Sequence, residues 1–344
     1  MHPELEPDGT PTAFVRLGDT KPTWHRARTS TQALESLGIA EAFGAPVVDD
    51  QGDWYLFSVG DEAKVWRAYS ASPITLGHAE TGYFAQRGAA SQAGKVVSLA
   101  IRGGAGAPDE LWAASRQGST FTASSLGISL TQSELRLAAD GTRLLGGFVT
   151  ESGAWQGEIR VAQAAAVKLP FVIGNTLEGP LGIAPGDSSW LAAAHPLASA
   201  IQVAFPGGEQ LELPNSARLE DVGCAQNSPV CTPTCTQKTT GVRGIVALGH
   251  AGNAYFAYVD VKIDRTFDLE PRCGGPGCIC DPTLKADATT ADLVIVRVST
   301  SGATEVARWP TEYLGVARLI GVQRGGRAAL AYGRQIVGID LGKL

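Results

Sequence analysis

The sequence predicts an all-β fold built from repeated sheets of four short strands. Six short glycine-containing turns recur between apolar strands, and their glycines are 42, 47, 45, 66 and 74 residues apart. One four-stranded sheet per repeat accounts for the shorter spacings. The turns are Asp50-Gln51-Gly52-Asp53, Gln92-Ala93-Gly94, Ala139-Asp140-Gly141, Pro185-Gly186-Asp187, His250-Ala251-Gly252-Asn253 and Arg324-Gly325-Gly326.

The composition fits a folded, turn-rich chain. Hydrophobic residues make up 44% of the sequence, charged residues only 18%, and there are 42 glycines and 19 prolines. These values argue against disorder and for many turns. The net charge of −6 argues against nucleic acid as a partner. No apolar run reaches the roughly 18–20 residues of a membrane span, and the N-terminal segment lacks the pattern of a signal peptide.

Strands can be placed in order around the six turns. The first repeat places them at residues 45–48, 54–59, 64–69 and 73–76. At residues 295–298, Ile295 and Arg297 point to one face and Val296 and Val298 to the other. This period of two is typical of a strand in a sheet that is covered on one face. The remaining strands are expected at 96–101, 111–114, 120–123, 135–137, 144–149, 158–161, 167–170, 181–183, 190–194, 201–204, 211–213, 244–248, 255–261, 293–298, 304–309, 319–322, 328–332 and 336–340.

The chain ends need a separate interpretation. The last repeat lacks its outer strand, and residues 12–17 and 23–27 form a hairpin without a sheet of its own. We expect this hairpin to pair with the last repeat, which hides two sheet edges. Residues 30–43 are the best candidate for a short helix.

The segment Ala138-Ala139-Asp140-Gly141-Thr142-Arg143-Leu144 resembles the Asp-Gly turn that precedes an apolar strand in bacterial β-propeller repeats. The resemblance covers nearly the whole chain and concerns architecture alone. It implies a propeller, and the six turns and the chain ends then predict a single domain over residues 1–344, with six four-stranded blades closed by N-terminal strands. Seven blades, counting the N-terminal half-repeat separately, and a β-sandwich are the alternatives.

All six cysteines lie in two long insertions at the fifth repeat, residues 219–241 and 264–290. Strand direction places both insertions on one face of the ring. Three disulfides are expected, at least one between the insertions, because each holds an odd number of cysteines. Zinc binding and free thiols are the alternatives. The cysteines are Cys224, Cys231, Cys235, Cys273, Cys278 and Cys280.

Disulfides indicate an oxidising compartment, so a periplasmic, surface-anchored or secreted protein is expected. The function that fits is a non-catalytic binding or scaffold protein with a protein or glycan partner. It would be a monomer or part of an envelope complex. The alternative is an extracytoplasmic propeller enzyme of the glycosidase or lyase type. Arginines are scattered, no carboxylates recur on inner strands, and no nucleophile or zinc-protease motif occurs.

The insertion face is the expected contact surface, because cross-links order loops that the repeats do not need. The candidate binding residues there are Arg272, Asp268, Glu270, Asp281, Phe267 and Ile279. No cofactor is expected. Calcium is the one ion considered, at the acidic turn Asp49-Asp50-Gln51-Gly52-Asp53 or at the carboxylates of the second insertion, although both are ordinary solvated turns or loops in the simpler interpretation.

Overall fold

The structure is a computed structural model of the whole chain. It describes residues 1–40, 43–49, 51–58, 62–68, 70, 72–78, 83–92, 95–104, 107–117, 120–130, 135–139, 144–150, 153–159, 166–168, 181–183, 191–193, 201–204, 210–213, 218–222, 234–274, 277–299, 301–312 and 319–344. Within these ranges the chain forms antiparallel strands and one short 3-10 turn, η1 (Leu341–Lys343), with no α-helix. The predicted turns at Gly94, Gly141 and Gly186 lie outside the described residues.

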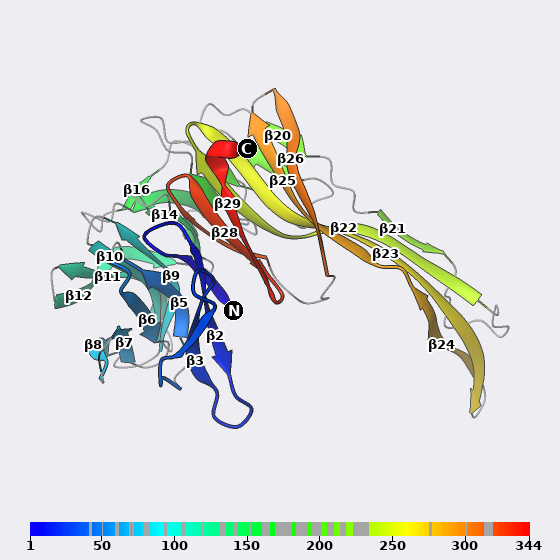
Figure 1. Cartoon of the computed structure of the whole chain (residues 1–344), viewed down its shortest axis with the longest axis horizontal. Coiled ribbons are helices and arrows are strands. Elements are labelled where there is room, and N and C mark those ends of the chain that lie inside the picture. The colour runs from blue at the N-terminus through cyan, green and yellow to red at the C-terminus, as the bar shows by residue number, and fades with distance from the viewer. Residues whose placement is uncertain are drawn as a thin grey trace.

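Four sheets of four consecutive strands come first in the chain (Figure 1). They are β1 (His2–Leu5), β2 (Pro11–Leu17), β3 (Thr23–Arg28) and β4 (Ala33–Ser36); β5 (Phe43–Val48), β6 (Trp54–Ser58), β7 (Glu62–Arg67) and β8 (Ile74–His78); β9 (Tyr83–Gln92), β10 (Lys95–Gly104), β11 (Ala107–Gln117) and β12 (Thr120–Leu130); and β13 (Leu135–Ala139), β14 (Leu144–Thr150), β15 (Gly153–Ile159) and β16 (Ala166–Lys168).

Four further sheets complete the described part of the chain. They are the pair β17 (Leu181–Ile183) and β18 (Leu191–Ala193); the pair β19 (Ile201–Ala204) and β20 (Gln210–Leu213); the sheet of β21 (Arg218–Val222), β22 (Thr234–His250), β23 (Asn253–Gly274), β24 (Gly277–Asp287), β25 (Thr290–Ser299) and β26 (Gly302–Thr311); and the sheet of β27 (Ile320–Arg324), β28 (Arg327–Tyr332) and β29 (Gln335–Asp340).

One strand from each of seven sheets contacts its neighbour in cyclic order. β1 contacts β5, β5 contacts β9, β9 contacts β13, β13 contacts β17, β17 contacts β22, β22 contacts β27, and β27 contacts β1. Successive sheets therefore follow one another around a ring, and the first and last sheets are neighbours. The predicted strands of the first repeat agree with β5 to β8 to within two residues at each end.

Two expectations about the N-terminal region are wrong. Its strands do not pair with the last repeat among the described residues; they form the separate sheet β1-β2-β3-β4. The signal was a further turn at Gly9, which has φ of 81° and lies 43 residues before Gly52, within the repeat spacing. The expected helix over residues 30–43 is instead an edge strand, β4, paired with β3 from Arg28 to His25.

The first and last sheets of this cycle pack against each other and share no strand among the described residues. Strands β1 and β2 contact β27, β28 and β29. A Cβ atom on Gly9 would lie 2.9 Å from Arg327 Cγ, and one on Gly338 would lie 2.7 Å from Pro11 Cγ. The two sheets therefore approach so closely that side chains on these glycines would collide with the neighbouring sheet.

The largest described core lies between the sixth and seventh sheets of this cycle. It contains Val259 and Ile295, both with no exposed surface, together with Leu330 at 1% exposure. A second core between the first two sheets contains Phe14, Trp24, Ile39, Val48, Trp54 and Leu56. The apolar alternation of the strands thus fills the spaces between neighbouring sheets.

Gly321 allows β27 to approach β22 in the larger core. A Cβ at this position would lie 2.3 Å from Val246 Cγ1 and 2.9 Å from Leu330 Cδ2. We expect Gly321→Ala to lower the free energy of unfolding by about 1–3 kcal/mol through overpacking. Urea unfolding measures the change. Ile320→Ala, at an exposed position of the same strand, serves as the control and should cost less.

Candidate functional site

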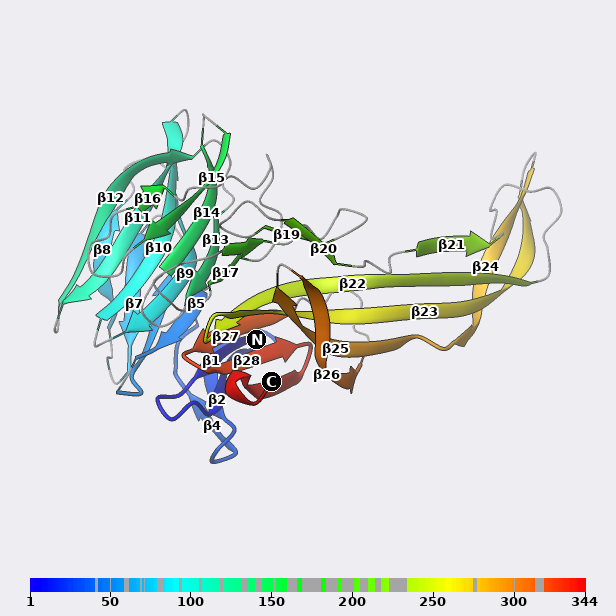
Figure 2. The same ribbon diagram turned by 90° about the horizontal axis from the view of Figure 1, so that it is seen from above.

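A long β-arm projects from the ring (Figure 2). We call the described residues 218–222, 234–240, 263–274 and 277–287, in strands β21 to β24, the arm. β22 has 17 residues and β23 has 22, whereas most strands have 3–10. The inner half of β23 pairs with β25 in the ring, and its outer half pairs with β24. Both predicted insertions thus contribute strands to one continuous sheet.

A bulge lies in the part of β22 that belongs to the ring, four residues from the arm. The register of β22 against β23 shifts between Arg243 and Ile245. The residue between them, Gly244, has φ of 59°, and a Cβ there would lie 2.8 Å from the backbone nitrogen of Leu319. Only glycine suits this left-handed conformation and close approach. At the other side of the arm, the Ala288 N–H donates to the Asp264 carbonyl at 2.8 Å.

A salt bridge fixes the base of the outer hairpin formed by β23 and β24. Arg265 Nε lies 3.0 Å from Asp287 Oδ2, and these residues are opposite each other in the register. The Thr289 N–H also donates to Asp287 Oδ1 at 3.0 Å. Hydrogen bonds from Thr289 and Arg265 lower the pKa of the Asp287 carboxyl from its usual value.

One face of the arm holds a small buried cluster around two cysteines. Cys235, Leu269 and Cys280 are 5%, 7% and 3% exposed, and Phe267 packs against them. Neither cysteine is a free thiol; both are disulfide-bonded. Among the predicted binding residues, Phe267 therefore contributes to the interior of the arm.

The other face of the arm is polar and exposed. Side chains of adjacent residues point to opposite faces of a strand, which places Asp268 and Glu270 away from Leu269. Glu270 lies opposite Asp281, and both are exposed. Lys285 Nζ pairs with Asp268 Oδ1 at 3.1 Å. The structure thus brings together three of the predicted binding residues on one face.

The remaining predicted residues are described only in part. Arg272 lies opposite Ile279, and Cys273 lies opposite Cys278, in the register of β23 with β24. Their backbones are described and their side chains are not. Cys224 and Cys231 lie outside the described residues.

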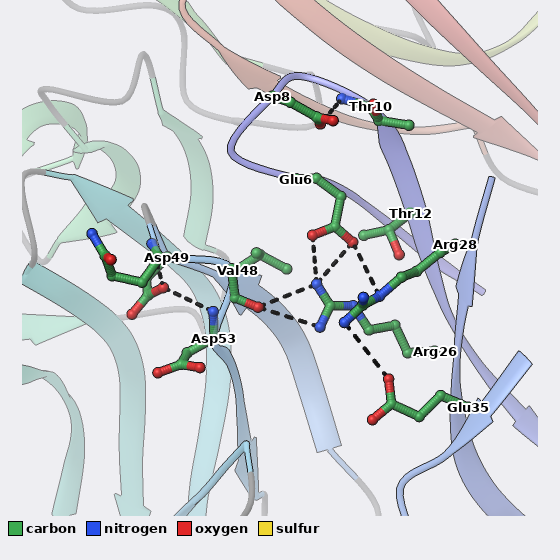
Figure 3. Close-up of polar contacts among 12 residues, drawn as sticks. Glu6, Asp8, Thr10, Thr12, Arg26, Arg28, Glu35, Val48, Asp49 and Asp53 are labelled. Carbon is green, nitrogen blue, oxygen red and sulfur yellow. Dashed lines mark hydrogen bonds and ion pairs between the residues drawn. The ribbon is translucent and has the colours of Figure 1, made fainter. Parts of the chain in front are cut away.

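A second polar cluster, not predicted from the sequence, joins the first two sheets of the ring (Figure 3). Arg26 on β3 is 1% exposed and reaches the turn after β1. Its Nη2 atom lies 2.8 Å from Glu6 Oε1 and 2.6 Å from Glu6 Oε2, and it donates to the Gly52 carbonyl at 3.3 Å. Arg28 Nε lies 3.9 Å from Glu6 Oε1 and is more exposed.

The acidic turn considered for calcium is held by its own hydrogen bonds. Asp49 Oδ1 accepts from the N–H groups of Gln51 and Asp53, both at 2.9 Å. Asp49 Oδ2 accepts from the Tyr55 hydroxyl at 3.1 Å and pairs with Arg116 Nη1 at 2.9 Å. This carboxylate therefore joins the second sheet to the third. The expectation that no cofactor binds stays a prediction.

A buried carboxyl lies where the ring closes. Glu4 on β1 is 8% exposed, and its carboxyl forms hydrogen bonds with the backbones of Val48 and Leu5. Burial raises its pKa to about 8, although Arg324 and these bonds act in the opposite direction. Arg324, from the seventh sheet of the cycle, donates to the carbonyls of Val48 and Asp49 in the second.

Two further observations on the described residues concern metal ligands and membrane helices. No group of three or more histidine, cysteine, aspartate or glutamate side chains arranged to hold a metal ion occurs among them. Nor does this part of the chain contain a helix long and apolar enough to cross a membrane. Arg26, Arg116 and Arg324 of the ring join neighbouring sheets, whereas Asp268 and Lys285 of the arm pair with each other on an exposed face.

Comparison with known proteins gives the fold and no family. No protein-family model matches the sequence, and no curated protein matches it. A chain from the crystal structure of the mitotic checkpoint complex aligns with a TM-score of 0.54 and 11% identity, covering 98% of this chain and 87% of that one. A putative TolB from Agrobacterium tumefaciens has a TM-score of 0.34 and 11% identity, covering 61% of this chain and 79% of that one. Virginiamycin B lyase from Staphylococcus aureus has a TM-score of 0.39 and 10% identity, covering 95% of this chain and 97% of that one.

The aligned chain of the mitotic checkpoint complex has a fold of the WD40 and β-propeller type. The chain is therefore a β-propeller protein, which confirms the architecture predicted from its glycine turns. At 11% identity the likeness concerns the fold alone.

Proposed function

We propose that this chain is a non-catalytic binding or scaffold propeller, and that the arm carries its contact surface. The observation that supports this is the separation of the arm from the ring. The cluster of Cys235, Leu269 and Cys280 is distinct from the ring core that contains Val259 and Ile295. The arm therefore has its own packing and is not needed to fill the ring.

A projecting sheet with its own packing is suited to recognition. Ordered elements on a rigid scaffold position contact residues without a large loss of conformational entropy on binding. The outward face offers Asp268, Glu270 and Asp281 together with Lys285. Both signs of charge on this face fit a protein or glycan partner.

Two further features of the proposal concern the ring and the compartment. The cyclic contacts from β1 to β27 support seven blades, the alternative that counts the N-terminal sheet separately. The disulfide-bonded Cys235 and Cys280 support an oxidising compartment, namely the periplasm, the cell surface or the medium.

The test is to replace the outer hairpin and measure capture. Residues 265–287 are exchanged for Asn-Gly, because Asp264 and Ala288 are hydrogen-bonded neighbours that a two-residue turn can join. Cys224, Cys231 and Cys235 become serine so that no thiol is left unpaired. The ring is expected to unfold at nearly the same temperature as in the intact chain, since its core is unchanged. Capture of cross-linked proteins from the native envelope or medium, and binding to a glycan array, should fall at least tenfold.

The matched control shortens an exposed hairpin loop of the ring. Residues 18–22 join β2 to β3 and are exchanged for the same Asn-Gly turn, which keeps the Leu17–Thr23 register. This variant should capture partners as the intact chain does. Equal capture by the arm variant, with the ring folded, would place the contact surface elsewhere and reject the proposal.

A further inference from the structure

The strand register of the arm restricts how its cysteines can pair. Cys235 on β22 lies opposite Phe267, and Cys280 on β24 lies opposite Pro271. They are on opposite sides of β23 and four residues apart along it. With about 3.3 Å per residue and 4.8 Å per strand, their Cα atoms are about 16 Å apart. A disulfide requires less than about 7 Å, so these two bonded cysteines belong to different bridges.

Cys280 has no suitable partner within its own hairpin. Cys273 lies opposite Cys278, which makes Cys280 its diagonal neighbour at about 7–8 Å. Cys278 is two residues away on the same strand, where side chains that point the same way are about 6.6 Å apart. The Cβ atoms of a disulfide lie only about 3.5–4.5 Å apart. Both pairings are therefore excluded.

Cys235 is also too far from the tip of the hairpin. Cys235 lies opposite Phe267 of β23. Phe267 is six residues from Cys273, so the two are about 20 Å apart along the strand. Neither Cys273 nor Cys278 is within reach. Among the six cysteines, only Cys224 and Cys231 remain as partners for Cys235 and Cys280.

We propose that Cys273 bonds to Cys278, that Cys280 bonds to Cys224 or Cys231, and that Cys235 bonds to the other of these two. Directly opposite residues of antiparallel strands have Cα atoms about 4.5–5.5 Å apart, within the range of a disulfide. With all six cysteines paired, the fifteen possible connectivities are reduced to two. No described cysteine is free.

The bridges have different roles in the arm. The Cys273–Cys278 bond closes the tip of the β23–β24 hairpin. The Cys280 bond ties β24 to the segment between β21 and β22, and so cross-links the two insertions. Each bridge forms when two thiols lose two protons and two electrons to a disulfide oxidant, which is reduced to two thiols.

Trypsin offers a direct test on the intact, oxidised chain. Cleavage after Arg218, Lys238, Arg272 and Lys285 gives two peptides, 219–238 and 273–285, with three cysteines each. Without reductant they should be found joined by one bridge. Fragmentation of the joined species should place that bridge at Cys280. Two separate peptides, a bridge at Cys273 or Cys278, or stoichiometric zinc would overturn the proposal.

Paired serine variants provide a second, independent measurement. Cys273→Ser with Cys278→Ser removes one complete bridge, so the denatured protein should contain no titratable thiol. Cys273→Ser with Cys280→Ser breaks two bridges and should expose two thiols. The reverse result, two thiols in the first variant and none in the second, would reject the proposed pairing. This inference does not depend on what the arm binds, so its failure leaves the capture experiment unaffected.

Discussion

Arg26→Ala is expected to lower the free energy of unfolding by about 3–5 kcal/mol, the cost of breaking a buried ion pair by removing one partner. Arg26 is 1% exposed and is the bulkiest fully buried side chain among the described residues. It binds both carboxylate oxygens of Glu6 and the Gly52 carbonyl. Its guanidinium also lies 5.9 Å from the centre of the Phe14 ring. Alanine removes these contacts and leaves Glu6 largely buried with only the distant Arg28.

Arg28→Ala is the matched control. Its side chain is 36% exposed and 3.9 Å from Glu6, so the loss should be at most about 1 kcal/mol. The pair Arg26→Met with Glu6→Gln removes both charges while keeping most of the volume, and should recover much of the stability lost in Arg26→Ala. Urea unfolding of the oxidised protein measures all three. Equal losses in Arg26→Ala and Arg28→Ala would show that the buried pair is not what joins the two sheets.

Glu4→Gln is expected to stabilise the protein at alkaline pH and to have little effect at acidic pH. The pKa of Glu4 is about 8 in the folded chain against 4.5 in the unfolded reference. Below 4.5 the carboxyl is protonated in both states. Between these values the unfolded state releases the proton and the folded state keeps it, so stability falls as the pH rises. Above about 8 the full cost of burying the charge is present.

Glutamine has the same shape and no charge to bury. The gain in the free energy of unfolding from Glu4→Gln should therefore grow from near zero at pH 4.5 to several kcal/mol at pH 9. This size follows because one pKa unit corresponds to about 1.4 kcal/mol. Thermal unfolding across this range measures it. Glu35→Gln, at a side chain that is 42% exposed, is the control and should give a flat difference. A pH-independent difference for Glu4→Gln would mean that the carboxyl ionises normally in the folded state.

Much of the ring could be predicted from its turns, because glycine is needed where the backbone has positive φ. Gly52, Gly252 and Gly325 all have such values, and each lies between paired strands. The N-terminal sheet was missed because its turn at Gly9 was not included in the repeat. Counting from that glycine would have placed β1 and β2 in their own sheet.

The arm was only partly predictable. Its cysteines, glycines and prolines predict cross-linked loops. The alternation of Ile263, Phe267 and Leu269 with charged residues was the available signal for a strand. Which carboxylates meet which arginines could not be predicted, since Arg324 and Val48 are 276 residues apart and meet only when the ring closes.

The continuity of β23 has a mechanical consequence. The same strand contains Phe256 and Val259, which have no exposed surface, and Asp268 and Glu270 on the arm. The strand runs without interruption from Asn253 to Gly274. A transverse load at the tip therefore produces a bending moment in the buried part of β23, around Phe256 and Val259. A load along the strand is borne as shear across many hydrogen bonds at once. The arm behaves as a cantilever built into the ring, and its direction is set by the twist of the core strands rather than by a flexible joint.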